Sequence, residues 1–266
     1  MLKQRLITAF ILLPLFFFAL YFLPATLWVI MTLTIALIGA WEWGGIAGYS
    51  PKERLFYVAA TLFVALVLWV QGEIGRGSAF ALSSIFWLLP AWLWLVFQWR
   101  LKNAVGLALL GWLVLLPTWL ALGYLREIGP NLLMVILMVV WVADSAAYFA
   151  GRRFGKRKLA PAISPGKSWE GVYGALLAVT VFGALLVKLA LASWWLIVAF
   201  WGMTVLSIVG DLFESWLKRV AGIKDSGAIL PGHGGVLDRI DGLTSTLPVA
   251  ALCVAYTCVD WGSLAK

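Results

Sequence analysis

Residues 104–124 read AVGLALLGWLVLLPTWLALGY, and none of these side chains is charged. A helix that crosses a bilayer needs about 20 mostly apolar residues in succession. A strand of a membrane barrel would instead alternate apolar and polar residues over about ten positions. The unbroken apolar run therefore predicts a transmembrane helix.

Eight further stretches have the same character. The nine predicted spans cover residues 6–23, 26–47, 55–71, 79–98, 104–124, 132–150, 172–192, 194–213 and 244–262. The first span follows a basic start, but it is longer than the core of a cleavable signal peptide and no A-x-A-like site follows it, so we expect it to be retained. The pattern indicates an all-α, polytopic membrane protein with about nine transmembrane helices.

The composition excludes an ordinary soluble domain. Only 12% of the side chains are charged and 63% are apolar, whereas soluble domains carry about 25% charged residues. The formal net charge of +8 therefore does not indicate a soluble nucleic-acid-binding protein, and we expect no nucleic acid partner. Cys253 and Cys258 lie in one apolar stretch and are too few for a zinc site, so we interpret them as packing residues.

The positions of Lys and Arg predict the orientation, because cytoplasmic loops are enriched in these residues. With a cytoplasmic N-terminus, 16 of the 20 basic residues fall on the inner side: Lys3, Arg5, Lys52, Arg54, Arg100, Lys102, Arg152, Arg153, Lys156, Arg157, Lys158, Lys167, Lys218, Arg219, Lys224 and Arg239. The outer side and the outer span ends keep only Arg76, Arg126, Lys188 and Lys266. We expect a protein of the inner (plasma) membrane whose two longer loops, 151–171 and 214–243, are cytoplasmic and whose C-terminus is outside.

No internal repeat or long linker divides the chain, which predicts a single membrane domain over residues 1–266. We expect residues 1–130 to be mainly a helical scaffold and residues 131–266 to carry the catalytic motifs. Three acids, Glu42, Asp144 and Asp211, nevertheless fall inside predicted spans near their cytoplasmic ends. A carboxylate is costly inside a bilayer, so each either reaches the interface or a nearby cation, or lines a polar cavity that opens to the cytoplasm.

The spacing that begins at Asp211 is informative. Asp211, Glu214, Ser215 and Lys218 stand at i, i+3, i+4 and i+7, which places them on one face of a helix. A glycine-rich segment follows at 232–235, where backbone N–H groups can approach a ligand closely. If the ninth helix starts near this segment, two more acids, Asp238 and Asp241, share one of its faces.

Several carboxylates that converge beside several cations suit Mg²⁺ and phosphate groups. We predict Asp211, Asp238 and Asp241 as metal ligands and, with Lys218 and Arg219, as the catalytic set. The predicted substrate-binding residues are Asp144, Ser164, Lys167, Ser215, Lys224, Asp225, His233, Gly234, Gly235 and Arg239. The alternative interpretation of the cluster is a solvated loop with balanced charge.

His233 is the only histidine, which raises the question of a general base. A phosphate oxygen is already ionised and needs no base in order to attack. We therefore interpret His233 as a phosphate-binding or loop-shaping residue, with base catalysis as the weaker alternative.

The other long loop carries a basic run at 152–158, which is typical of attraction to anionic lipid head groups. It continues into Ser-Pro-Gly-Lys-Ser at 164–168. This sequence is similar to part of a phosphate-binding loop, but Pro161 stands where the first glycine of that motif is required.

The motifs together resemble a known family. The segments SWLKR at 215–219, KDSG at 224–227 and LPGHGGVLDRID at 230–241 resemble the signature of the phosphatidate cytidylyltransferases, also called CDP-diacylglycerol synthases. Asp144 to Tyr148 and the segment 164–171 are similar to that family as well, although Gly166 stands where many members have a second lysine.

This resemblance implies the reaction CTP + phosphatidate → CDP-diacylglycerol + diphosphate, in phospholipid biosynthesis. It implies Mg²⁺ held in the region from Asp211 to Asp241, and a second, monovalent cation such as K⁺. It also implies a homodimer, with CTP, phosphatidate and anionic membrane lipids as partners.

Two other functions fit the residues less well. A transporter of an anionic or lipid substrate would explain acids within spans, but no inverted repeat is present and the charge gathers on one side. A polyprenol kinase or a CDP-alcohol phosphotransferase would also be a membrane transferase. The latter class carries D-G-x-x-A-R, whereas Asp241-Gly242 is followed by LTST.

Overall fold

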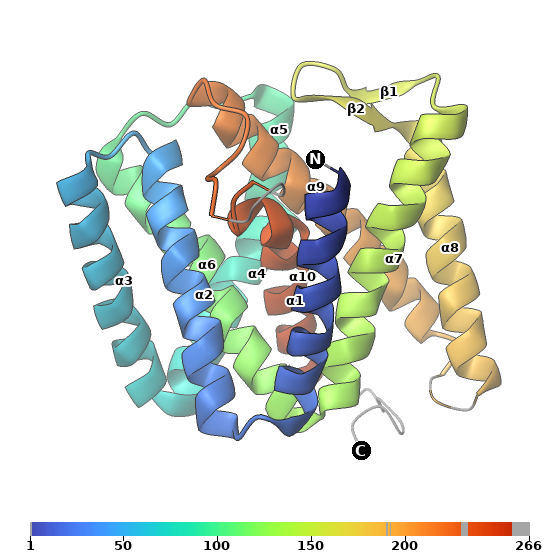
Figure 1. The fold of residues 1–266 in the computed structure, drawn as a ribbon, viewed down its shortest axis with the longest axis horizontal. Helices are drawn as coiled ribbons and strands as arrows, with labels where there is room; N and C mark the ends of the chain where they lie inside the picture. The colour runs from blue at the N-terminus through green and yellow to red at the C-terminus, as the bar shows by residue number, and fades with distance from the viewer. Residues whose placement is uncertain (1, 190, 192, 230–233, 257–266) are drawn as a thin grey trace.

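The computed structural model describes residues 2–189, 191, 193–229 and 234–256 (Figure 1). This part of the chain is almost entirely helical. The helices are α1 (Leu2–Phe22), α2 (Ala25–Ile46), α3 (Pro51–Val70), α4 (Gly72–Leu88), α5 (Pro90–Phe97), α6 (Ala104–Ile128), α7 (Pro130–Phe154), α8 (Trp169–Lys188), α9 (Leu196–Val220) and α10 (Leu237–Tyr256). Two short strands, β1 (Lys158–Ala160) and β2 (Ser164–Ser168), form an antiparallel hairpin between α7 and α8.

The predicted all-α polytopic architecture is confirmed. In the described residues, seven helical segments have the length and hydropathy needed to cross a membrane, and Leu13–Phe22 of α1 is a shorter apolar helix. Each of the nine predicted spans overlaps a helix. Crossing by α1 and α10 stays a prediction.

Helices α4 and α10 begin at Gly72 and Leu237, earlier than the predicted spans that start at 79 and 244. Two further differences have identifiable reasons. The fourth span is broken at Leu89, because proline lacks an N–H and disfavours helical geometry in the residue before it, and Pro90 follows. Helix α9 continues to Val220, about two turns beyond the predicted end. It stops at Gly222, whose φ of +73° suits glycine, and Ile223 N–H donates to Lys218 O as in a Schellman cap.

The helices form one bundle with α10 inside it. Helix α10 packs on α9, α6 and α4, while α7 and α8 pack on each other at one side and α3 lies at the opposite side (Figure 1). Helices α6 and α7 contribute many of the long side chains of the core, including Leu120, Leu125 and Leu133.

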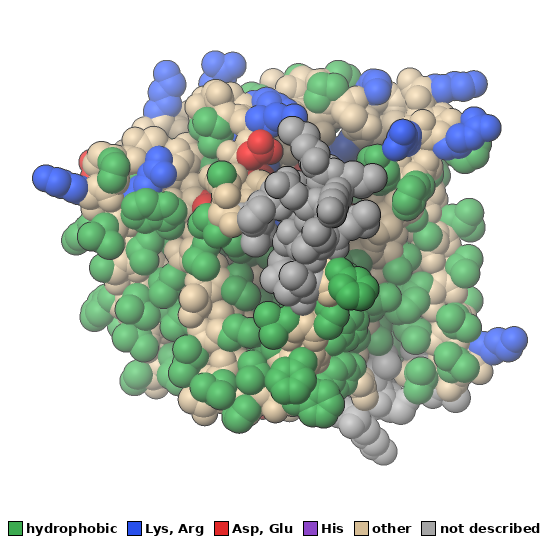
Figure 2. Space-filling view, in the orientation of Figure 1, with side chains coloured by type: hydrophobic (Ala, Val, Ile, Leu, Met, Phe, Trp, Pro, Cys, Tyr) green, Lys and Arg blue, Asp and Glu red, His purple; other side chains and the backbone are tan. Residues whose placement is uncertain are grey.

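Charge is concentrated at one end of the bundle. Basic side chains line the edge that carries the β1–β2 hairpin, whereas the flanks below it are mostly hydrophobic (Figure 2). Many large apolar side chains on the flanks are exposed, for example Phe56, Leu82 and Leu177. Such a surface is suited to lipid, with a polar end at the membrane surface.

Candidate active site

The polar residues predicted on one helix face do lie on one helix, α9. Ser215 Oγ donates a hydrogen bond to Asp211 Oδ1 over 3.2 Å. One turn later, Lys218 Nζ lies 3.1 Å from Glu214 Oε1, and both of these side chains are buried. Because α9 extends past this region, the four groups are held by a regular helix rather than by a loop.

Lys218 also joins α9 to α10. Its Nζ lies 2.5 Å from Asp238 Oδ1. The second oxygen of Asp238 accepts hydrogen bonds from Ser226 N at 3.0 Å and Gly235 N at 2.8 Å, and it lies 3.0 Å from Ser226 Oγ. Both carboxylate oxygens of Asp238 are thus engaged by protein donors.

Glu42 of α2 is part of the same network. Its carboxylate is almost fully buried, at 2% exposure. It accepts hydrogen bonds from Val236 N at 3.0 Å, Leu237 N at 2.8 Å and Ser226 Oγ at 3.1 Å. A carboxylate from another helix therefore caps the N-terminus of α10, where unpaired N–H groups favour negative charge.

Two glycines make room for the Glu42 carboxylate. A Cβ atom added at Gly227 or Gly235 would overlap its oxygen atoms. The Cβ at Gly235 would also overlap Ser226 Oγ. The glycines at these positions allow the loop to close around a charged side chain.

A second group of carboxylates surrounds Lys167 of the hairpin. Lys167 Nζ lies 2.5 Å from Asp211 Oδ2. Asp144 of α7 accepts a hydrogen bond from Ser207 Oγ at 3.4 Å and interacts electrostatically with Asp211 and Lys167. Asp241 of α10 interacts electrostatically with Asp211, Glu214 and Lys167. The structure thus brings acids from α7, α9 and α10 together with a lysine from β2.

The donor atoms of this group are of the kind that Mg²⁺ binds, namely carboxylate and hydroxyl oxygens. In the described residues, however, no three acidic, His or Cys side chains are placed to hold a metal ion. Lysine ammonium groups stand beside Asp211 and Asp238. Among the described residues, the carboxylate of Asp241 has fewer protein partners than those of Asp211 and Asp238. It accepts a hydrogen bond from the adjacent Gly242 N–H.

The remaining predicted site residues that the structure describes lie on α9, on the hairpin, in the loop after α9 or at the start of α10. Arg219 Nε donates to Ile163 O at 3.3 Å and so links α9 to the hairpin. Ser164 lies at the start of β2, and Lys224 and Asp225 are exposed in the loop after α9. Gly234 lies before α10 with a φ of +82°, and Arg239 is exposed in the first turn of α10. His233 lies outside the described residues.

Ser226 and Glu42 were not among the predicted site residues. Ser226 lies inside the KDSG segment, where its small hydroxyl gave no chemical signal of its own. Glu42 was noticed only as an acid within a span. Its capping role depends on contacts with Ser226 and Val236, which follow it by 184 and 194 positions in the sequence. Local spacing does not reveal such contacts.

The chain is similar to known proteins along nearly its whole length. The model of the cytidylyltransferase family matches residues 3–257. The phosphatidate cytidylyltransferase of Pseudomonas aeruginosa is 41% identical over 99% of this chain and 100% of its own length. The phosphatidate cytidylyltransferases of Haemophilus influenzae and Brucella suis are 36% and 35% identical, over 93% and 86% of this chain and 96% and 90% of their own lengths. With a match along nearly the whole chain, this protein belongs to the cytidylyltransferase family.

Proposed function

We propose that the protein is a phosphatidate cytidylyltransferase, which converts CTP and phosphatidate to CDP-diacylglycerol and diphosphate in phospholipid biosynthesis. The observation that carries this proposal is the cluster of acids and lysines formed by α7, β2, α9 and α10 at the charged end of an apolar bundle. The names of the relatives, which match over most of the chain, support the same substrate pair.

The cluster suits nucleotidyl transfer. A phosphate oxygen of phosphatidate attacks the α-phosphorus of CTP, a new P–O bond forms, and the bond to the β-phosphate oxygen breaks to release diphosphate. The attacking oxygen is already ionised, so the protein has to position the phosphates and neutralise their charge rather than remove a proton. Lys167 and Lys218 are the cations that we assign to this task.

We propose Mg²⁺ as the cofactor, held by Asp211 and Asp241. When bound, Mg²⁺ neutralises and orients phosphate oxygens. Asp211 would hold the ion only when Lys167 leaves its Oδ2 atom. Asp238 would join this ligand set only when Lys218 leaves its Oδ1 atom, and in the present arrangement it holds Lys218 and the loop before α10 in place. A monovalent cation such as K⁺ and a homodimer remain expectations from the family resemblance.

We further propose that the charged end faces the cytoplasm from the inner membrane, with the N-terminus on that side and the C-terminus outside. The distribution of 16 basic residues against four supports this orientation. In a cysteine-free background, Lys224→Cys should react with a membrane-impermeant thiol reagent only after the cells are opened. Glu73→Cys, at an exposed position of the other end, should react in intact cells.

The proposed activity is tested with protein purified in detergent and supplied with CTP, phosphatidate and Mg²⁺. We expect release of diphosphate that depends on both substrates and on Mg²⁺. A transporter would release none. A polyprenol kinase would accept a lipid alcohol, and a CDP-alcohol phosphotransferase would consume CDP-diacylglycerol, so these lipids serve as controls.

A further inference from the structure

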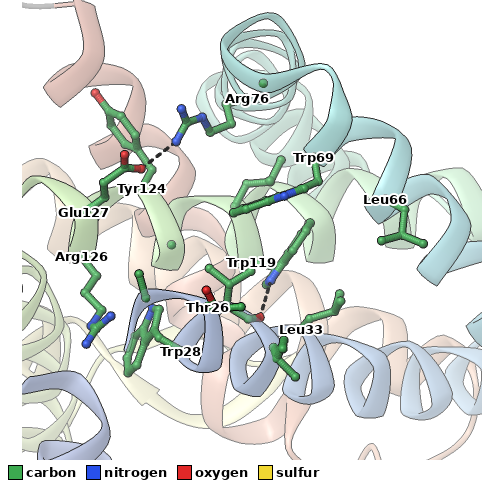
Figure 3. Close-up of a pocket in the computed structure, with 16 residues that line it drawn as sticks. Thr26, Trp28, Leu33, Leu66, Trp69, Arg76, Trp119, Tyr124, Arg126 and Glu127 are labelled. Carbon is green, nitrogen blue, oxygen red and sulfur yellow. Dashed lines mark hydrogen bonds and ion pairs between the residues drawn. The ribbon is translucent and has the colours of Figure 1, made fainter. Parts of the chain in front are cut away.

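A cavity of about 630 Å³ lies at the end of the bundle opposite to the candidate active site. It is bounded by the first half of α2, the junction of α3 and α4, and the last turns of α6 (Figure 3). Glu42 lies about 25 Å further along α2 than Ala25, for a rise of about 1.5 Å per residue. The volume is in the range of about 300–1,000 Å³ that is typical of small-molecule sites.

The cavity has a polar end and an apolar end. Arg76, Arg126 and Glu127 lie on one side of it, whereas Leu33 and Leu66 lie on the other (Figure 3). Leu33 lies about two turns after the start of α2, further from this end of the bundle. This gradient matches an amphiphile that has a charged head and a hydrocarbon chain.

Aromatic side chains are concentrated around the cavity. Trp28, Trp69, Trp119 and Tyr124 line the cavity, and tryptophan and tyrosine are enriched at membrane–water interfaces. The guanidinium of Arg126 lies 5.1 Å from the centre of the Trp28 ring, which holds this cation at the mouth of the cavity.

The charges at the mouth balance. Arg76 forms ion pairs with Glu73 and, at 2.9 Å, with Glu127. Arg126 donates hydrogen bonds to Leu20 O and Leu23 O, so two carboxylates and two guanidinium groups lie at this end. Arg76 Nε is buried and has no hydrogen-bond partner among the described residues. A head group with only negative charge would meet two carboxylates here, whereas a zwitterionic head group offers a phosphate to arginine and an ammonium to glutamate.

We propose that this cavity binds one zwitterionic glycerophospholipid from the leaflet opposite to the active site. Its phosphate lies beside Arg76, its ammonium beside Glu127, and one acyl chain extends toward Leu33 and Leu66. Because the cavity is bounded by α2, α3, α4 and α6, the lipid fixes these helices relative to one another. It is a resident lipid rather than the substrate, and the proposal stands whether or not the proposed activity is correct.

The chain offers a matched pair of variants for a test. A Cβ at Gly123 of α6 would meet only Val29 Cγ2, at 3.6 Å, so a larger side chain at this position extends into the cavity. Gly202 of α9 is exposed on an apolar helix and would meet nothing within 4 Å. Gly202→Leu therefore makes the same change on a lipid-facing surface.

The measurement is native mass spectrometry of detergent-purified protein titrated with phosphatidylethanolamine. We expect the wild type and Gly202→Leu to retain one lipid, and Gly123→Leu to bind it about tenfold more weakly or worse. Failure of the wild type to retain a lipid, or equal retention by Gly123→Leu, would overturn the proposal.

A second variant covers the case in which Gly123→Leu does not fold. Glu127 is 68% exposed and its ion pair in the described structure is with Arg76, so Glu127→Lys leaves the helix packing intact and makes the mouth cationic. We expect the preference for phosphatidylethanolamine over phosphatidylglycerol to shift toward phosphatidylglycerol by about threefold or more. An unchanged preference would contradict the assignment of the head group.

Discussion

The carboxylate of Glu42 and the hydroxyl of Ser226 lie 3.1 Å apart, although 184 positions separate them in the sequence. Ser226 Oγ also lies 3.0 Å from Asp238, and a hydroxyl has only one proton to donate. It therefore donates to one carboxylate at a time, while its backbone N–H serves Asp238. Through Ser226, the scaffold helix α2 fixes the loop on which the candidate active site depends.

The first prediction concerns Glu42→Gln. The amide keeps the size of the side chain but turns one acceptor into a donor, which would face the N–H group of Val236 or Leu237. Buried hydrogen bonds to a charged group contribute about 1.5–3 kcal/mol each, so we expect turnover to fall by about tenfold or more and the unfolding temperature to drop. Glu73→Gln, at an exposed position, is the control. Equal turnover and thermal stability in the two variants would contradict the capping role.

The second prediction concerns the glycine that admits the Glu42 carboxylate. Gly235→Ala should destabilise the protein by about 1–3 kcal/mol, as is typical of overpacking, because its methyl group overlaps Glu42 and Ser226. Gly202→Ala has open space around it and should have little effect. Thermal unfolding in detergent measures the difference, and a Gly235→Ala protein as stable as Gly202→Ala would refute the close packing.

The third prediction separates the structural and functional roles of Lys218. Lys218→Met leaves the buried Glu214 without its cation, and breaking a buried ion pair in this way costs about 3–5 kcal/mol. Adding Glu214→Leu removes one of the two acids that lose their cation and should restore part of the stability, while Asp238 keeps its hydrogen bonds from the loop before α10. If Lys218 binds a substrate phosphate, turnover stays low in the double variant. Recovery of turnover together with stability would show that the lysine is structural only.

The fourth prediction compares Asp241, a proposed metal ligand, with Asp238, which holds Lys218 in the present arrangement. Asp241→Asn removes a charge whose hydrogen bond among the described residues comes from Gly242 N–H, so we expect turnover to fall by about 100-fold or more, corresponding to about 2.7 kcal/mol, with little change in stability. Asp238→Asn breaks the contact with Lys218 and weakens the hydrogen bonds from the loop, so it should lower both turnover and stability. Mg²⁺ titration of turnover together with thermal unfolding checks both variants. A stable Asp241→Asn protein with normal Mg²⁺-dependent turnover would remove Asp241 from the metal site.

Much of the fold follows from local sequence patterns. A backbone inside a bilayer has to satisfy its own hydrogen bonds, so long apolar runs predict helices reliably. The spacing of Asp211, Glu214, Ser215 and Lys218 likewise predicts one helical face, because helix geometry is regular. Gly222, placed just after Lys218 and Arg219, is a helix-end signal that would have corrected the predicted end of α9.

The rest depends on contacts between distant segments. Nothing near Glu42 in the sequence indicates that it caps a helix that begins at Leu237. The prediction of Asp238 as a metal ligand likewise rested on local spacing. Its contacts with Lys218 and Gly235 form only when α9 and α10 are packed together. The β1–β2 hairpin was missed because its strands have only three and five residues, too few for a clear alternation pattern.

The most direct test of the proposed function is formation of CDP-diacylglycerol by purified protein from CTP, phosphatidate and Mg²⁺, identified by mass spectrometry. Lys167→Gln removes the cation that lies 2.5 Å from Asp211, whereas Lys188→Gln changes an exposed lysine at the end of α8. We predict product from the wild type and from Lys188→Gln at equal rates, and a loss of about 100-fold in Lys167→Gln. Absence of CDP-diacylglycerol with the wild type, or a normal rate in Lys167→Gln, would contradict the account.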